Sequence, residues 1–287
     1  MTRPRTTKRG AAATGRRRLN AWMGKNVSQT LPQPLLDVRG VTLHYKTRDH
    51  LVTATYRVDF SIQRSDRFIL LGPSGCGKST LLKAVGGYMA PVEGEIRLKG
   101  ERITRPGPDR MMVFQEFDQL LPWKTVRQNV AFALETSGKL RGKAADEKAM
   151  HYIEKVHLTR AADSFPHTLS GGMKQRVAIA RGMAMEPDIL LMDEPFAALD
   201  ALTRQRMQDE LLMLWEETKF TVLFVTHSIA EAVKIGNRIL LLSPHPGQVK
   251  AEMNSAPIGA EPAEVAALET RIHDMLFSDK VEEDDHV

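Results

Sequence analysis

Gly72-Pro73-Ser74-Gly75-Cys76-Gly77-Lys78-Ser79 is the stretch of sequence that decides the fold. It fits the spacing G-x-x-x-x-G-K-S, follows the apolar run Phe68-Ile69-Leu70-Leu71 and precedes Thr80-Leu81-Leu82, where a helix is expected. Glycines let a loop between a strand and a helix curl until successive backbone N–H groups face one point, and the helix N-terminus adds positive potential there. We therefore predict that residues 72–80, the phosphate loop, bind the phosphates of a nucleotide.

The residues of the phosphate loop have separate expected tasks. Lys78 is expected to reach the β- and γ-phosphates, the Ser79 hydroxyl to bind Mg²⁺, and Thr80 to reinforce the contacts with the α-phosphate. For Cys76 we favour a small filling side chain over a redox switch. The predicted nucleotide-binding positions of this loop are Gly72, Pro73, Ser74, Gly75, Cys76, Gly77, Lys78, Ser79 and Thr80.

Two acids end an apolar run further along the chain. Asp193 and Glu194 directly follow Ile189-Leu190-Leu191-Met192. Because the carboxyl ends of parallel strands meet at one edge of a sheet, these acids should lie beside the phosphate loop. We predict that Asp193 holds Mg²⁺ through water and that Glu194 is the general base that orients and polarises the attacking water. The alternative is that both acids simply end a strand in solvent.

Two further polar residues follow apolar runs in the same way. His227 comes after residues 221–226 and Gln115 after residues 111–114. At the same edge of the sheet, His227 is placed to sense the γ-phosphate, and the Gln115 amide to meet Mg²⁺ or the water. Neither residue is informative alone, since a histidine after a strand is more often structural.

The stretch Leu169-Ser170-Gly171-Gly172-Met173-Lys174-Gln175-Arg176 resembles the signature sequence of ABC ATPases. As an N-cap, Ser170 would leave the N–H groups of Gly171 and Gly172 exposed, which creates a second phosphate-binding helix terminus on one chain. The resemblance implies that two ATPase subunits associate head to tail, with each ATP between the phosphate loop of one and residues 170–172 of the other. Hydrolysis then needs a dimer, either of identical or of different subunits.

The other ABC motifs occur in order within residues 35–253. The resemblance assigns adenine stacking to Tyr45, the Q-loop to Gln115, the Walker B acids to Asp193 and Glu194, and the switch to His227. It also assigns the D-loop to Ala198-Leu199-Asp200, which places Asp200 at the nucleotide. Tyr45 is the weakest of these assignments, because a tyrosine in a strand is often merely packed.

Three segments are similar to the nitrate/sulfonate/taurine importer ATPases: FDQLLPW (117–123), PFAALD (195–200) and LLSPHPG (241–247). This similarity implies uptake of a small solute, with integral membrane permease subunits and a solute-binding protein as partners. It places the chain at the cytoplasmic face of the inner membrane. The segment after Gln115 would line a groove for a permease helix, which gives Leu121 and Trp123 a function beyond core packing.

The pattern of the whole chain predicts an α/β fold of the P-loop NTPase type. Strands and helices alternate from residue 189 to 242, as in a RecA-like parallel sheet core. Strand patterns at 35–45 and 51–60 indicate an N-terminal antiparallel β subdomain, and helical periodicity indicates an inserted helical subdomain at about 118–172. We predict a basic arm at 1–33, an ATPase domain at 34–255, and a helical appendage with an acidic tail at 256–287.

Composition narrows the function further. A single cysteine, Cys76, excludes an intrachain disulfide, and the basic N-terminus lacks the apolar core of a secretory signal, so we expect a reducing cytoplasm. No apolar stretch is long enough to span a bilayer, so we do not expect the chain itself to cross a membrane. Eight Lys and Arg precede the first acid, Asp37, so a chain with a formal charge of +5 has −3 after this arm. We expect the arm to be disordered, in preference to lipid or nucleic-acid binding, and no specific nucleic acid as a partner.

The main alternative is a soluble ABC ATPase that acts on nucleic acid or the ribosome. Fewer than 100 residues separate Lys78 from Ser170, without sustained heptads, which leaves no room for the long coiled coil of chromosome and repair ATPases. A single phosphate loop also differs from the fused translation-type members. A P-loop kinase, in turn, has no use for the signature helix.

Overall fold

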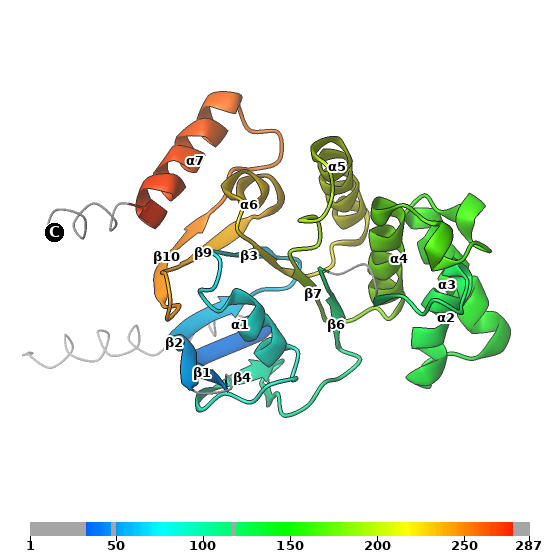
Figure 1. Ribbon diagram of the computed structural model, residues 1–287, viewed down its shortest axis with the longest axis horizontal. Coiled ribbons are helices and arrows are strands. Elements are labelled where there is room, and N and C mark those ends of the chain that lie inside the picture. The colour runs from blue at the N-terminus through cyan, green and yellow to red at the C-terminus, as the bar shows by residue number, and fades with distance from the viewer. Residues whose placement is uncertain (1–32, 47–49, 116–118, 278–287) are drawn as a thin grey trace, which may run out of the picture. The chain divides into compact units, whose positions relative to one another are not determined.

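The computed structural model describes residues 33–46, 50–115 and 119–277 (Figure 1). Residues 34–287 make up one compact unit of the chain. Most of the basic arm and the acidic residues 282–285 lie outside the described residues, so the expectations for them stay predictions.

The central sheet has the order β10-β9-β3-β8-β7-β6. Its strands β3, β6, β7, β8 and β9 run parallel, and β10 pairs antiparallel with β9 at one edge. Parallel strands are covered on both faces, which explains their continuous apolar runs. The six strands are β3 (Arg67–Leu71), β6 (Arg110–Val113), β7 (Ile189–Asp193), β8 (Val222–Thr226), β9 (Arg238–Leu242) and β10 (Val249–Asn254).

A second sheet is formed by the N-terminal strands and has the order β2-β1-β4-β5. All of its pairings are antiparallel. The predicted α/β class, with a parallel core and an N-terminal antiparallel sheet, is confirmed. The strands of this sheet are β1 (Leu36–Lys46), β2 (Leu51–Ile62), β4 (Glu93–Leu98) and β5 (Glu101–Arg102).

Alternate residues of β3 belong to two different cores. Phe68 and Leu70 join the antiparallel sheet and α1 (Lys78–Val85), whereas Ile69 and Leu71 join the helices of the opposite face. The period-2 alternation of strand side chains thus places one layer on each face of the central sheet. Each large apolar side chain buried in this way stabilises the fold by about 1.5–3 kcal/mol.

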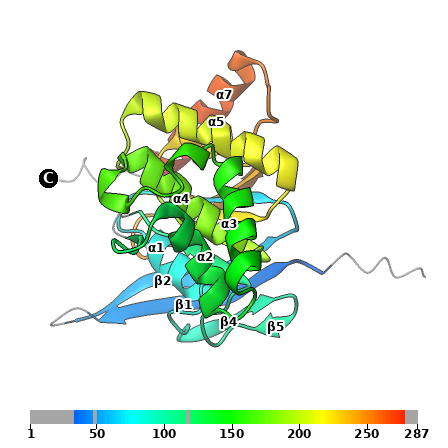
Figure 2. The same cartoon turned by 90° about the vertical axis from the view of Figure 1, so that its right-hand side faces the viewer.

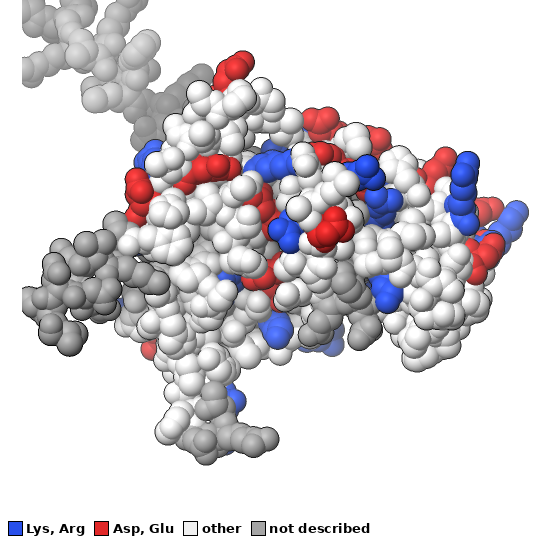
Figure 3. Space-filling model, turned by 45° about the horizontal axis from the view of Figure 1, so that its top comes forward, with Lys and Arg blue, Asp and Glu red and all other residues white. Residues whose placement is uncertain are grey.

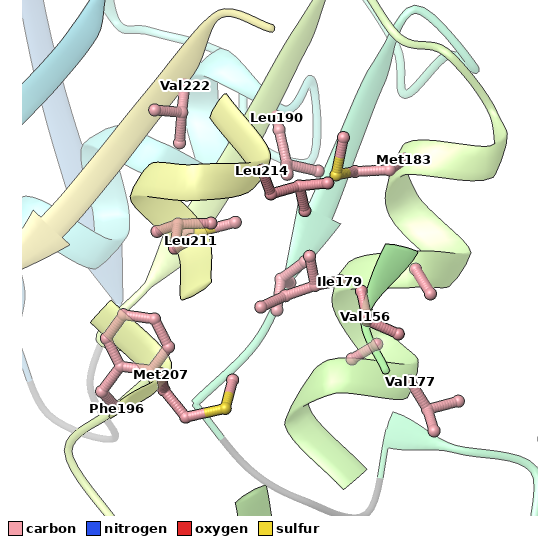
Figure 4. Close-up of a cluster of buried hydrophobic side chains, with 14 of the residues drawn as sticks. Val156, Val177, Ile179, Met183, Leu190, Phe196, Met207, Leu211, Leu214 and Val222 are labelled. Atoms are coloured by element: carbon pink, nitrogen blue, oxygen red, sulfur yellow. The ribbon is translucent and has the colours of Figure 1, made fainter. Parts of the chain in front are cut away.

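The opposite face is covered mainly by α4, α5, α6 and α7 (Figure 1). Figure 4 shows side chains of α4, α5 and β7 meeting in this core, among them Ile179, Leu190 and Leu214. The C-terminal α7 contributes the buried Ile272 and Leu276 to the same core. These helices are α4 (Gly171–Ala184), α5 (Ala201–Thr218), α6 (Ile229–Ile235) and α7 (Pro262–Phe277).

The helical segment between β6 and β7 contains α2 (Val126–Thr136), α3 (Gly142–Lys155) and α4 (Gly171–Ala184). Figure 2 shows these helices grouped together. Helix α2 begins with a capping box in which Thr125 and Gln128 satisfy each other's backbone N–H groups.

No helix among the described residues is long and apolar enough to cross a membrane. On the face of the molecule shown in Figure 3, Lys and Arg are interspersed with Asp and Glu.

Candidate nucleotide-binding site

The phosphate loop joins β3 to α1, as the sequence predicts. Lys78 is the first residue of α1, is 4% exposed, and donates hydrogen bonds of 2.8 Å to the carbonyls of Gly72 and Pro73. Gly77 has φ 93°, and a Cβ there would lie 2.5 Å from the Ala54 carbonyl oxygen of β2. A side chain at position 77 is therefore excluded by both its backbone conformation and its contact with β2.

Ser79 and Asp193 meet across the edge of the sheet. The Ser79 hydroxyl, at the start of α1, donates a 2.8 Å hydrogen bond to Asp193 Oδ1, at the end of β7. These two elements therefore bring one hydroxyl and one carboxylate together. Asp193 is 9% exposed, and burial raises the pKa of its carboxyl above the usual range. Hard oxygen donors of this kind fit Mg²⁺, and a bound cation would favour the ionised carboxylate.

The described residues contain no group of three or more His, Cys, Asp or Glu that could hold a metal ion.

Glu194 and His227 also come together at this edge. His227 Nδ1 lies 2.9 Å from Glu194 Oε2, although the two residues are 33 positions apart in the sequence. Glu194 has φ 44°, a left-handed conformation that is uncommon for a residue with a side chain, and its N–H donates to the Val225 carbonyl at 3.1 Å. Both side chains line a small pocket of about 50 Å³ together with Phe196 and Arg204.

Gln115 follows β6 and is exposed, without a hydrogen bond to any other described residue. Tyr45 lies near the end of β1 and is 39% exposed, which leaves its ring free for stacking. The structure therefore groups Ser79 with Asp193 and Glu194 with His227, whereas Gln115 and Tyr45 are exposed to solvent.

The signature residues begin α4. Ser170 is its N-cap and accepts a 3.3 Å hydrogen bond from the Met173 N–H. A Cβ at Gly172 would lie 3.0 Å from the Thr203 methyl group, so glycine permits the close approach of α4 to the start of α5. Figure 1 places α4 well apart from α1 of the same chain.

Asp200 caps α5 by accepting a 3.0 Å hydrogen bond from the Thr203 N–H. This backbone hydrogen bond lowers the pKa of the Asp200 carboxyl.

A residue to which the sequence assigns no role supports the phosphate loop from behind. Gly247 donates to the Ala54 carbonyl at 3.0 Å and accepts from the Tyr56 N–H at 2.9 Å. A Cβ at Gly247 would lie only 2.1 Å from the Cys76 carbonyl oxygen. The glycine of the LLSPHPG segment is a sequence signal for a close approach of two backbone segments, but nothing in the sequence indicates which segment it approaches.

Comparison with known proteins decides the family. A family model described as "ABC transporter" matches residues 56–197. The chain is 48% identical over 203 residues to the taurine import ATP-binding protein TauB of Rhizobium johnstonii, covering 71% of this chain and 77% of that protein. The chain belongs to the ABC transporter family.

Two further relatives of this ABC transporter ATPase have similar coverage. The aliphatic sulfonates import ATP-binding protein SsuB of Bacillus cereus is 42% identical over 77% of this chain and 87% of its own. The nitrate import ATP-binding protein NrtD of Synechococcus elongatus is 40% identical over 79% and 86%, respectively. The predicted resemblance to nitrate, sulfonate and taurine importer ATPases is thereby confirmed.

A solved structure supports the fold and the chemistry of the ABC transporter ATPase. It is the dimeric structure of a post-hydrolysis state of an ATP-binding cassette bound to ADP and Pi. The two chains are 31% identical and superpose with a TM-score of 0.66. The match covers 78% of this chain and 100% of the chain in that structure. The chain is an ABC-type ATPase that binds ATP, as the sequence predicted.

Proposed function

We propose that this ATPase powers the uptake of a small solute by hydrolysing MgATP between two copies of the chain. The solutes that we favour are nitrate, taurine and other sulfonates. One observation carries the proposal. The phosphate loop and the helix terminus at Ser170 belong to separate parts of the same chain, so each copy offers two unlike halves of a nucleotide site. Head-to-tail association of two copies would complete both sites.

The residues around the phosphate loop have the chemistry that hydrolysis requires. Lys78 would leave the carbonyls that it contacts and bind the β- and γ-phosphates, while Ser79 and Asp193 would hold Mg²⁺. When bound, Mg²⁺ neutralises charge on the phosphates. Glu194 is oriented by its backbone and by His227, and would accept the proton of the attacking water.

Residues from other elements would complete each site. Gln115 would meet Mg²⁺ or the water, Tyr45 would stack on adenine, and His227 would report the presence of the γ-phosphate. Ser170, Gly171 and Gly172 of the second copy would bind the γ-phosphate from the opposite side, near Asp200. Closure of the two copies on ATP, followed by hydrolysis and release of phosphate, would be the mechanical cycle.

The proposed partners are a second ATPase subunit, integral permease subunits and, through the permease, a solute-binding protein. The side chain of Trp123 is 69% exposed in the segment before α2, which supports a docking role for this segment. Attachment to a permease would place the chain at the cytoplasmic face of the inner membrane. The relatives named for taurine, sulfonates and nitrate support these three solutes as candidates.

Capture of the native complex tests the proposal. We would purify tagged Glu194→Gln protein from its own membranes in mild detergent with ATP, and identify associated proteins by mass spectrometry. A polytopic permease in stoichiometric amount is the expected result, with tagged Lys78→Ala protein as the control for ATP-dependent recovery. Recovery of ribosomal or nucleic-acid-binding partners without a permease would refute transport and favour the soluble ABC alternative.

A further inference from the structure

The loop that carries Gln115 is closed at its base by one side chain. The amide nitrogen of Gln119 donates to the Phe114 carbonyl at 2.9 Å, and the Phe114 N–H donates to Gln119 Oε1 at 3.3 Å. The Gln119 amide thus pairs with the Phe114 backbone as a neighbouring strand would. Gln115 directly follows Phe114, the residue whose backbone makes these two hydrogen bonds.

Arg181 of α4 holds the other side of Gln119. Its guanidinium donates to the Gln119 carbonyl at 2.7 Å and lies 3.5 Å from Gln119 Oε1. No carboxylate among the described residues forms an ion pair with Arg181, and burial lowers the pKa of its guanidinium. A partly buried cation depends on the acceptors that it reaches, and among the described residues the two oxygens of Gln119 are the side-chain and backbone acceptors that Arg181 reaches.

The helix that carries Arg181 also carries the signature residues. Helix α4 begins after Ser170 and continues to Ala184, so Arg181 is about three turns from the helix start. One position beyond Arg181, a Cβ at Gly182 would lie 2.9 Å from Leu190 Cδ1 of β7. The helix therefore packs closely on the sheet at the level where Arg181 reaches the loop.

We propose that Gln119 and Arg181 are positioning residues that fix Gln115 relative to the Mg²⁺ site and tie it to the signature helix. The inference rests on the proposed function, in which Gln115 meets Mg²⁺ or the attacking water. Because α4 is a single helix, a displacement of its N-terminus by the second copy's ATP would reach the base of the Gln115 loop through Arg181. Nucleotide at one site would thus adjust the geometry of the other.

The dependence of ATPase activity on Mg²⁺ tests this role. In the full chain, Gln119→Ala and Arg181→Met should each raise the Mg²⁺ concentration for half-maximal ATPase activity roughly tenfold, the scale of one hydrogen bond to a charged group. Affinity for a fluorescent ATP analogue without Mg²⁺ should stay within about twofold, because the phosphate loop is untouched. Arg160→Met, an exposed position in the same helical segment, is the matched control.

A double variant decides whether the two residues act together. Gln119→Ala with Arg181→Met should be no worse than the more severe single change, since both break one connection. Arg181→Lys keeps one donor for the Gln119 carbonyl and should fall between wild type and Arg181→Met. This variant also remains informative if the methionine variant does not fold.

Three results would overturn the inference. They are Mg²⁺ dependence in the single variants equal to that of Arg160→Met, additive losses in the double variant, and a lowered unfolding temperature with unchanged Mg²⁺ dependence. Failure of the proposed function looks different: a failure of MgATP hydrolysis would appear in the wild-type chain itself, and a failure of transport alone would leave the comparison of the variants unaffected.

Discussion

The imidazole of His227 lies 2.9 Å from the carboxylate of Glu194, at the carboxyl ends of the neighbouring strands β8 and β7. Glu194 is held from two sides: its backbone adopts a left-handed conformation fixed by the Val225 carbonyl, and its side chain meets His227. A carboxylate held in this way is oriented by contacts within the protein itself. Such preorganisation is what a general base requires.

Glu194→Gln should lower ATP turnover by at least about 100-fold, because an amide cannot accept the proton of the attacking water. The amide can still hydrogen-bond to His227, so the fold and ATP affinity should be retained. Single-turnover phosphate release and equilibrium binding of a fluorescent ATP analogue measure the two quantities. Turnover close to that of the wild type would remove Glu194 from the role of general base.

Lys78→Ala should weaken ATP binding by at least about tenfold, since a charge-assisted contact with phosphate is lost. Lys78 is buried and donates to the Gly72 and Pro73 carbonyls and, at 3.9 Å, to Cys76 Sγ, so the loop should also relax in the variant. Lys143→Ala, at a lysine whose side chain is 91% exposed, is the control. Normal ATP affinity in Lys78→Ala would contradict the assignment of the phosphate loop.

Much of the fold follows from local pattern. The strand before the phosphate loop, α1 after it, and the strands that end at Asp193 and Thr226 are all visible as apolar runs with polar ends. Strand β10 was missed, because Val249–Asn254 is largely exposed and polar at the sheet edge and lacks an apolar run. Its pairing with β9 comes from tertiary context.

The site was predictable to the extent that it follows strand ends. Asp193 is the last residue of β7, and Glu194 and His227 directly follow β7 and β8, so a parallel sheet brings all three to one edge. The connection from Arg181 to Gln119 was not predictable, because 62 residues separate the two and neither has a distinctive spacing. The approach of Gly247 to Cys76 likewise depends on how β2 and the β9–β10 turn pack behind the loop.

Asp193→Asn should raise the free energy of unfolding of the nucleotide-free chain at neutral pH by about 1 kcal/mol. This is the scale of many substitutions that remove a functional group kept at a cost in stability. Burial raises the pKa of Asp193, so its ionised form destabilises the folded state above that pKa. As the pH falls through the raised pKa, the folded wild type takes up a proton before the unfolded chain does and regains this stability. The advantage of asparagine should therefore shrink toward acid pH.

Urea unfolding of wild type and Asp193→Asn at several pH values measures this difference. Mg²⁺-dependent ATPase activity should be lost in the same variant, because a neutral amide replaces the charged carboxylate that attracts Mg²⁺. A stability difference that grows toward acid pH would contradict the assigned direction of the pKa shift.

Gly247→Ala should weaken ATP binding about tenfold and destabilise the chain by about 1–3 kcal/mol, as overpacking does. Gly247 cannot easily move away from Cys76, because two backbone hydrogen bonds fix it to β2. β2 in turn contacts Gly77 through the Ala54 carbonyl, so the phosphate loop is confined from the same side at two successive residues.

The added methyl group must therefore displace the Cys76 carbonyl, and with it the N–H groups that are expected to face the phosphates. Gln248→Ala, at an exposed position in the same turn, should leave ATP affinity unchanged, since it removes a side chain and keeps the backbone pairing with Ser243. Titration of both variants with a fluorescent ATP analogue, alongside urea unfolding, separates the two effects. Reduced stability with wild-type ATP affinity would show that Gly247 supports the fold without shaping the phosphate loop.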